Sequence, residues 1–237
     1  RHYAFFRAAG QPSGAIPDTM TGMSETVRVS EIFRSLQGEG TRTGWPCVLV
    51  RLAGCNLRCR WCDTPYARDG GEERTVTQVL AEVARYATAM VEVTGGEPLV
   101  QPGTPALLRA LCDAGYETLL ETNGSVDLAG VDARVVKIMD VKCPSSGASA
   151  STRWENLARL SAGDEVKFVL AGREDYEHAR RVCAERGLCD RLAVTFSPVA
   201  GELDPAQLAE WILADGLRVR LGLQLHKILW PDKDRGV

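Results

Sequence analysis

The chain has 237 residues and a mass of 25.8 kDa, and 45% of its residues are hydrophobic and 25% are charged, a composition typical of a globular protein rather than a disordered or fibrous one. Its 28 basic and 31 acidic residues give a net charge of −3 and form no long basic run, so we expect no direct contact with nucleic acid. Because no apolar stretch approaches the roughly 18 to 20 residues of a membrane span, and the first residues do not resemble a secretion signal, we expect a cytoplasmic protein with no membrane contact.

The first residues differ in composition from the rest of the chain. Residues 1–24 mix Gly, Pro, Ser and Thr without helical or strand periodicity, so we expect a disordered or expression-derived segment outside the fold. The length of the remainder is that of one α/β domain. We therefore expect residues 25–237 to form a single domain.

Short β-branched runs alternate with helical patterns through the rest of the chain. They predict strands at 47–52, 90–94, 116–121, 135–141, 165–170, 191–196 and 217–223, and helices at 76–87, 104–114, 174–187 and 204–215. Such alternation is typical of a parallel sheet with helices outside it. Six or seven units are too few for a closed barrel of about 250 residues. We expect an α/β fold, a partial TIM-type barrel of about six parallel strands with outer helices and with its chemistry at the carboxyl ends of the strands.

A cysteine-rich loop follows the first predicted strand, where Cys55, Cys59 and Cys62 form a C-x3-C-x2-C pattern. Thiolates are soft ligands that suit iron–sulfur clusters or zinc. A structural zinc site normally has four protein ligands, whereas three thiolates on a four-iron cluster leave one iron open. Structural zinc and simple burial of the thiols remain as alternatives. We interpret the other five cysteines as core or incidental residues: Cys47, Cys112, Cys143, Cys183 and Cys189.

The cysteine loop and the T-G-G-E-P segment at 94–98 together resemble the radical S-adenosylmethionine (SAM) superfamily. The resemblance implies a [4Fe–4S] cluster on the three cysteines, whose open iron chelates the amino and carboxylate groups of SAM. Reductive cleavage of SAM then gives a 5′-deoxyadenosyl radical that removes hydrogen from the substrate. Gly96 and Glu97 would face the SAM amino group.

Further polar segments stand at predicted strand ends, namely E-T-N-G-S at 121–125, D-V-K-C-P at 140–144 and F-S-P-V at 196–199. Each is also compatible with an ordinary turn, and Asp140 and Lys142 could form a simple ion pair. The superfamily resemblance implies that the loop and the strand ends share a SAM site. Its expected residues are Trp61, Cys62, Asp63, Gly96, Glu97, Asn123, Asp140, Val141, Lys142, Phe196, Ser197, Pro198 and Val199.

A narrower resemblance comes from E-I-F-R-S-L-Q-G-E-G at 31–40, Arg51 and C-D-T at 62–64, which are similar to the 7-carboxy-7-deazaguanine synthase family. That resemblance implies a carbon–nitrogen lyase of queuosine biosynthesis, which contracts the ring of 6-carboxy-5,6,7,8-tetrahydropterin with loss of ammonia. Arg51 can bind a carboxylate with two nitrogens. The resemblance also implies Mg²⁺ on Thr64, an ion that takes few protein ligands.

The end of the chain, Q-L-H-K-I-L-W-P-D-K-D-R-G-V, resembles the family's ending, in which the last strand and the C-terminus cover the active site. The family also implies an external electron donor such as flavodoxin and a homodimer. No side chain identifies itself as a general base. A glycyl-radical-enzyme activating enzyme and a non-catalytic zinc-binding module are the alternatives. The expected substrate-binding residues are Leu36, Gln37, Gly38, Glu39, Arg51, Thr94, His226 and Val237.

Overall fold

The structure is a computed structural model that describes residues 25–237, so the predicted N-terminal segment 1–24 lies outside the described residues. One sheet of nine strands runs through it in the order β3-β1-β2-β4-β5-β6-β7-β8-β9. The strands are β1 (Thr26–Leu36), β2 (Pro46–Leu52), β3 (Glu72–Thr75), β4 (Met90–Gly95), β5 (Glu117–Thr122), β6 (Val136–Val141), β7 (Glu165–Leu170), β8 (Ala193–Pro198) and β9 (Arg220–Leu221). The helices are α1 (Val76–Val83), α2 (Thr104–Asp113), α3 (Arg173–Arg186), α4 (Leu188–Arg191), α5 (Pro205–Ala214) and α6 (Leu225–Leu229).

The sheet is parallel from β2 through β9 and does not close into a barrel. Each pair from β2/β4 to β8/β9 is parallel, whereas β1 and β3 join the β2 side in antiparallel pairs. Because β9 contributes only two residues, six parallel strands of full length remain. The predicted α/β partial barrel is therefore confirmed.

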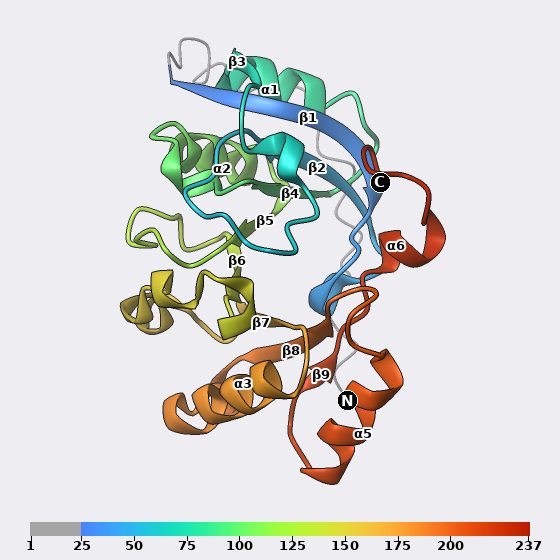
Figure 1. Ribbon diagram of the computed structural model, residues 1–237. Coiled ribbons are helices and arrows are strands. Elements are labelled where there is room, and N and C mark those ends of the chain that lie inside the picture. The colour runs from blue at the N-terminus through green and yellow to red at the C-terminus, as the bar shows by residue number, and fades with distance from the viewer. Residues whose placement is uncertain (1–24) are drawn as a thin grey trace, which may run out of the picture.

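The outer face of the sheet is apolar and is covered by helices. Strand residues alternate between the two faces, and the outward set of β2 and β4, which includes Val50 and Val93, packs with α1 and α2 in one core cluster. A second cluster joins β7 and β8 to α3 through Phe168, Phe196 and Tyr176. Figure 1 shows α1, α2 and α3 along one side of the sheet, while α6 and the C-terminus lie on the opposite side.

The inner face changes character along the strands. Near the amino ends it is apolar, with a small cluster of Cys47, Leu49, Met90, Leu119 and Ile138. Toward the carboxyl ends the same face carries Arg51, Glu121, Asp140 and Lys167, which line a cavity. The fold therefore presents charged side chains where a barrel of this kind places its chemistry.

Several elements differ from the sequence-based expectations. β1 was not predicted, because its alternation of apolar and polar residues breaks off after Val29, where a bulge between Val29 and Glu31 interrupts the register. The segment predicted as a strand at 217–223 contains only the two exposed residues of β9. Where no helix was predicted, the connection between β6 and β7 consists of short 3-10 turns, and α6 lies in the C-terminal segment.

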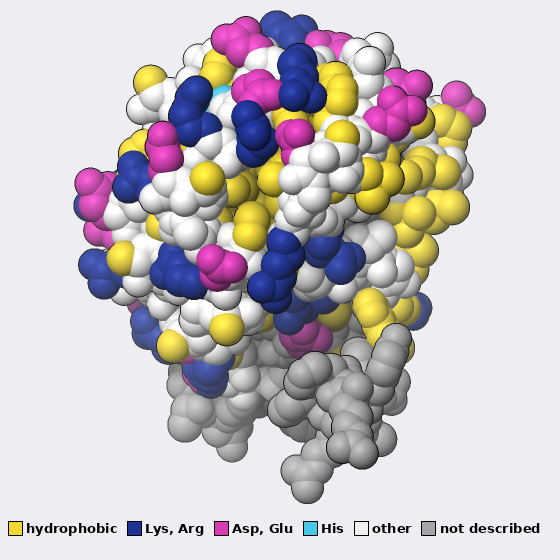
Figure 2. Space-filling model, turned by 90° about the horizontal axis from the view of Figure 1, so that it is seen from below, with side chains coloured by type: hydrophobic (Ala, Val, Ile, Leu, Met, Phe, Trp, Pro, Cys, Tyr) yellow, Lys and Arg dark blue, Asp and Glu magenta, His cyan; other side chains and the backbone are white. Residues whose placement is uncertain are grey.

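The surface of the described residues carries both signs of charge. On the face shown in Figure 2, basic and acidic side chains are interspersed among apolar ones. Within residues 25–237 no helix has the length and apolar character needed to cross a membrane.

Candidate active site

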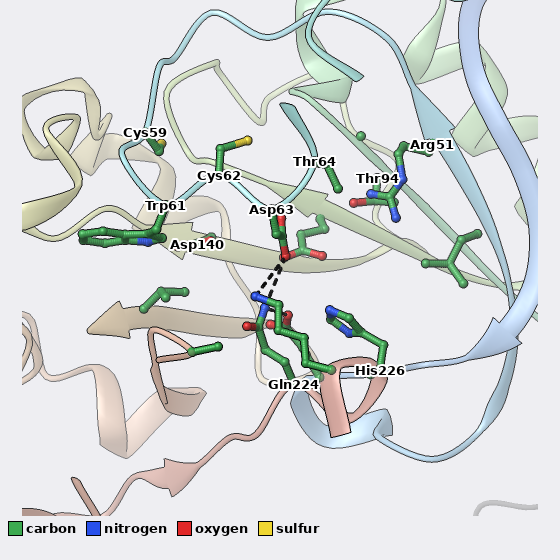
Figure 3. Close-up of a pocket in the computed structure, with 18 of the residues that line it drawn as sticks. Arg51, Cys59, Trp61, Cys62, Asp63, Thr64, Thr94, Asp140, Gln224 and His226 are labelled. Carbon is green, nitrogen blue, oxygen red and sulfur yellow. Dashed lines mark hydrogen bonds and ion pairs between the residues drawn. The ribbon is translucent and has the colours of Figure 1, made fainter. Parts of the chain in front are cut away.

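A cavity of about 590 Å³ opens at the carboxyl ends of the parallel strands, a size in the usual range for small-molecule sites. The cysteine loop, the turn after β1, the inner face of the sheet and the C-terminal segment all contribute to its wall. In Figure 3, Cys59 and Trp61 lie at one end of the view, Arg51 and Thr94 lie at the other, and Asp63 lies between them.

The three cysteines of the predicted motif all line this cavity. Cys55, Cys59 and Cys62 are free and partly exposed. The N–H of Leu57 donates to Cys55 Sγ at 3.4 Å, which is the kind of bond that tunes a thiolate ligand of an iron–sulfur cluster. Next to them, Arg60 fastens the loop by a two-pronged ion pair with Glu202 (2.9 and 2.7 Å).

These cysteines fit a [4Fe–4S] cluster as ligands. Among the described residues, no three His, Cys, Asp or Glu side chains are spaced around a single metal ion. A cubane cluster binds each thiolate at a different iron, so its ligands surround a cube and do not converge on one point. Three free thiols on one loop, in the wall of one cavity, match that donor set.

Two glycines at the end of β4 allow the chain to pass directly beneath the cysteine loop. A Cβ on Gly96 would lie 2.2 Å from Gly54 O and 2.7 Å from Cys55 Cβ. A Cβ on Gly95, which has a φ of +143°, would lie 2.1 Å from Leu52 O. Only glycine permits these approaches, so the T-G-G-E-P segment sets the position of the first cysteine.

The carboxylate of Glu97 is fully buried and does not line the cavity. It accepts hydrogen bonds from the N–H of Leu99 (3.1 Å), the hydroxyl of Thr122 (2.9 Å) and the N–H of Asn123 (2.6 Å). The sequence led us to expect Glu97 at the SAM amino group; in the structure these three donors hold its carboxylate. It ties the end of β4 to the end of β5 and fixes Asn123, which does line the cavity.

A charged network covers the inner face between β5 and β7. Lys142 Nζ donates to Asp140 at 2.8 Å, which confirms the ion pair that the sequence suggested. Lys167 Nζ lies 2.6 Å from Glu39, contacts Glu121 and lies 3.8 Å from Asp140. Lys167 is thus the common partner of three carboxylates.

The turn after β1 is tied to the sheet and to the tail. The amide of Gln37 donates to Glu92 and accepts from the N–H of Glu39 (3.1 Å). Gln224 Nε2 donates to Glu39 at 2.9 Å. Burial opposes ionisation of Glu39, but the charge and hydrogen bond of Lys167 outweigh it and lower the pKa of Glu39 to about 2.

Arg51 lies at the opposite end of the cavity from the cysteine loop. Its Nε donates to Glu31 at 2.8 Å, and the hydroxyl of Tyr66 donates to the same carboxylate oxygen at 2.7 Å. Because this bond uses only Nε, the two terminal nitrogens of the guanidinium are left for a ligand carboxylate.

The C-terminal segment closes the cavity next to the turn. Leu225 N donates to Gly38 O at 3.0 Å, and a Cβ on Gly38 would lie 2.7 Å from His226 Nδ1. Burial lowers the pKa of His226, so the ring is neutral at pH 7. Both His226 and Val237 line the cavity, whereas the last strand, β9, which was also expected to cover the site, contributes no residue to its wall.

Comparison with known proteins identifies the family. The Radical SAM superfamily profile matches residues 49–142. A Koribacter versatilis protein named 7-carboxy-7-deazaguanine synthase is 45% identical over 226 residues, covering 89% of this chain and 100% of that protein. The chain belongs to the 7-carboxy-7-deazaguanine synthase family.

Two further relatives agree with this assignment to the 7-carboxy-7-deazaguanine synthase family. A protein of the same name from Chlorobaculum tepidum is 45% identical over 215 residues, covering 89% of this chain and 97% of that protein. The crystal structure of QueE from Escherichia coli matches with a TM-score of 0.72 and 23% identity, covering 85% of this chain and 95% of that chain. The chain is thus a radical SAM enzyme of this family, and the QueE structure shares its fold.

The residues expected at the SAM site of a 7-carboxy-7-deazaguanine synthase fall into two groups. Those that line the cavity are Trp61, Cys62, Asp63, Gly96, Asn123, Asp140, Lys142 and Val199. Those that do not are Glu97, Val141, Phe196, Ser197 and Pro198. Phe196 and Val141 alternate onto the outer face and pack in the core, and Ser197 faces inward beneath Gly222, whose Cβ would lie 2.7 Å from its hydroxyl.

All eight expected substrate-binding residues line the cavity, as does the expected Mg²⁺ ligand Thr64. The sequence interpretation missed Glu92, Glu121, Lys167 and Gln224, which line it as well. The sequence does carry one signal for Lys167 and Glu92. A charged residue inside an otherwise apolar strand, as in E-V-K-F-V-L or M-V-E-V-T, indicates that one face of the sheet contains polar side chains.

Proposed function

We propose that this enzyme converts 6-carboxy-5,6,7,8-tetrahydropterin to 7-carboxy-7-deazaguanine with loss of ammonia, as a carbon–nitrogen lyase of queuosine biosynthesis. The observation that carries the proposal is that one cavity joins the cysteine loop to the Gln37–Glu39 turn and Arg51. The name shared by the relatives supports the same product.

At the cofactor end, Cys55, Cys59 and Cys62 would hold the [4Fe–4S] cluster. The cluster and SAM, when bound, supply the one-electron chemistry that begins a radical reaction. The contribution of the chain is to bind and orient them. Lys142 offers an ammonium to the SAM carboxylate, and Asn123, whose backbone N–H donates to Glu97, offers its polar side chain.

At the substrate end, the two terminal nitrogens of Arg51 suit the substrate carboxylate. The wall near the turn offers polar atoms for the amide-rich edge of the pterin, and His226, Thr94 and Val237 complete this end of the cavity. The C-terminal segment would also exclude water from the reacting atoms.

Magnesium would be bound between the two ends. Thr64 lines the cavity next to Asp63, whose carboxylate accepts from Gln224 at 3.4 Å. A hydroxyl together with substrate oxygens and waters is an acceptable set for Mg²⁺.

We further propose that the enzyme acts as a homodimer and receives electrons from an external donor such as flavodoxin. Its free cysteines and its proposed cluster suit a reducing compartment, the cytoplasm. The substrate is a small molecule in this proposal, and neither nucleic acid nor membrane is a direct partner.

The test is an anaerobic incubation of the iron-reconstituted protein with the pterin, SAM, Mg²⁺ and a reductant. We expect 7-carboxy-7-deazaguanine in the products. A protein that is brown, binds SAM and yet forms no deazaguanine would refute the proposed reaction and favour an activating enzyme. A colourless protein with one zinc would favour the binding module.

A further inference from the structure

A buried acid, Glu92, lies on the inner face of β4 at the base of the cavity. It pairs in register with Leu49 of β2 and with Leu119 of β5, and both leucines belong to the apolar inner cluster. Glu92 is only 2% exposed. Because a carboxylate between two leucines is costly, packing alone does not explain an acid here.

The contact that Glu92 makes is with the turn after β1. Gln37 Nε2 donates to Glu92 Oε2, while Oε1 of the same amide accepts from the N–H of Glu39. The amide of Gln37 therefore bridges β4 and the turn. Each end of this amide has a partner inside the protein, so these two bonds fix the shape of the turn.

We propose that Glu92 is a positioning residue, which acts through Gln37 to set the turn at residues 37–39 against the substrate end of the cavity. The inference rests on the proposed function, because the ligand of that turn is taken to be the carboxylated pterin. Glu39, at the far side of the turn, has its own partners in Lys167 and Gln224. At the near side of the turn, Gln37 is held by Glu92 of the sheet.

The surroundings of Glu92 keep it uncharged. Burial raises its pKa well above the ordinary value, and the negative charge of Glu121 raises it further. Burial also raises the pKa of Cys47, which faces it from β2 and stays a neutral thiol. The charged groups that face it are Glu121 of β5, Lys167 of β7, Glu39 of the turn and Arg51 of β2.

The sign of the pH dependence follows from this neutral state. The uncharged acid accepts from Gln37 without repelling Glu39 or Glu121, so the turn keeps its shape below the raised pKa. Ionisation at higher pH adds a third negative charge to this region and weakens the arrangement. Pterin affinity should therefore fall as the pH rises.

The experiment measures pterin binding to the cluster-loaded protein with SAM but without reductant, so that no turnover occurs. Glu92→Gln keeps a neutral acceptor, whereas Glu92→Leu removes it, and Glu73→Leu on the exposed strand β3 is the control. We expect the Kd for the pterin to rise about 10- to 100-fold in Glu92→Leu, as for loss of a buried hydrogen-bond partner. Glu92→Gln and Glu73→Leu should stay within about threefold of wild type.

The pH profile separates positioning from simple packing. As the pH increases through the raised pKa of Glu92, the wild-type Kd should rise, and that of Glu92→Gln should not. SAM affinity and cluster absorbance report folding, and if Glu92→Leu does not fold, the profile of Glu92→Gln decides. An unchanged Kd in a folded Glu92→Leu protein would overturn the role of Glu92 but not the proposed function. The same follows if the Kd of Glu92→Gln depends on pH as in the wild type. If the wild type does not bind the pterin, both the proposed function and the role of Glu92 are refuted.

Discussion

Lys167 donates to a carboxylate oxygen of Glu39 at 2.6 Å, which joins the inner face of β7 to the turn that follows β1. The same ammonium contacts Glu121 of β5 and lies 3.8 Å from Asp140 of β6. Three carboxylates from separate parts of the chain therefore share one buried cation. Both the stability of the inner face and the shape of the substrate end depend on it.

Replacement of Lys167 by Met should destabilise the protein by about 3 kcal/mol, because it leaves the partly buried carboxylates of Glu39 and Glu121 without their counter-charge. Urea unfolding measures the loss. Arg134→Met, which removes an exposed cation paired with Asp132 and Asp113, is the control and should change stability little. Equal losses in the two variants would show that Lys167 has no special role.

Glu39 should contribute to acid unfolding. Its pKa is about 2 in the folded protein and about 4.3 in an unfolded chain. A lowered pKa gives stability that is present above the unfolded value and is lost as the pH falls from there through about 2. In a Glu39→Gln variant, the free energy of unfolding should fall less steeply between about pH 4.5 and 2 than in the wild type. Parallel curves would contradict this assignment.

Gly96→Ala should prevent cluster assembly, because the new Cβ would lie 2.2 Å from Gly54 O and would push Cys55 out of place. We expect iron content after anaerobic reconstitution to fall well below the roughly four irons of one cluster. Gly130→Ala is the matched control, since a Cβ there meets no atom within 4 Å. A brown, fully loaded Gly96→Ala protein would count against the proposed packing of the glycine segment under the loop.

Arg51→Lys should weaken substrate binding without affecting SAM. A lysine has one nitrogen and cannot bond Glu31 and a ligand carboxylate with the planar fork that arginine offers. We expect the KM for the pterin to rise about 10- to 100-fold, while cleavage of SAM in the absence of substrate stays at the wild-type rate. Arg34→Lys, an exposed change on β1, should alter neither. A parallel loss of SAM cleavage would place Arg51 in the cofactor end instead.

Much of the fold could be predicted because its parallel strands are buried on both faces. Runs such as C-V-L-V-R-L and E-V-K-F-V-L can be recognised as strands without tertiary information, and the predicted bounds of β7 match those in the structure. β1 was missed because a bulge interrupts it and its apolar and polar residues follow no single period along the whole strand. β9 was overpredicted because an edge strand is limited by its single partner, β8, rather than by its own composition.

Site residues that belong to a sequence motif could be predicted, whereas residues whose role depends on tertiary contacts could not. The three cysteines, Arg51 and His226 come together in one cavity as expected. Glu97 does not line it, because the strand end turns the carboxylate toward Asn123. The roles of Lys167 and Glu92 depend on partners far away in the chain, and no local pattern reveals them.

The most direct test of the central claim is electron paramagnetic resonance of the reduced, iron-reconstituted protein with and without SAM. Three cysteine ligands leave one iron for SAM, so we expect a reduced [4Fe–4S] signal that changes when SAM is added, and no such signal in Cys59→Ala. A cluster signal that is identical with and without SAM, or one that persists after loss of Cys59, would contradict the account.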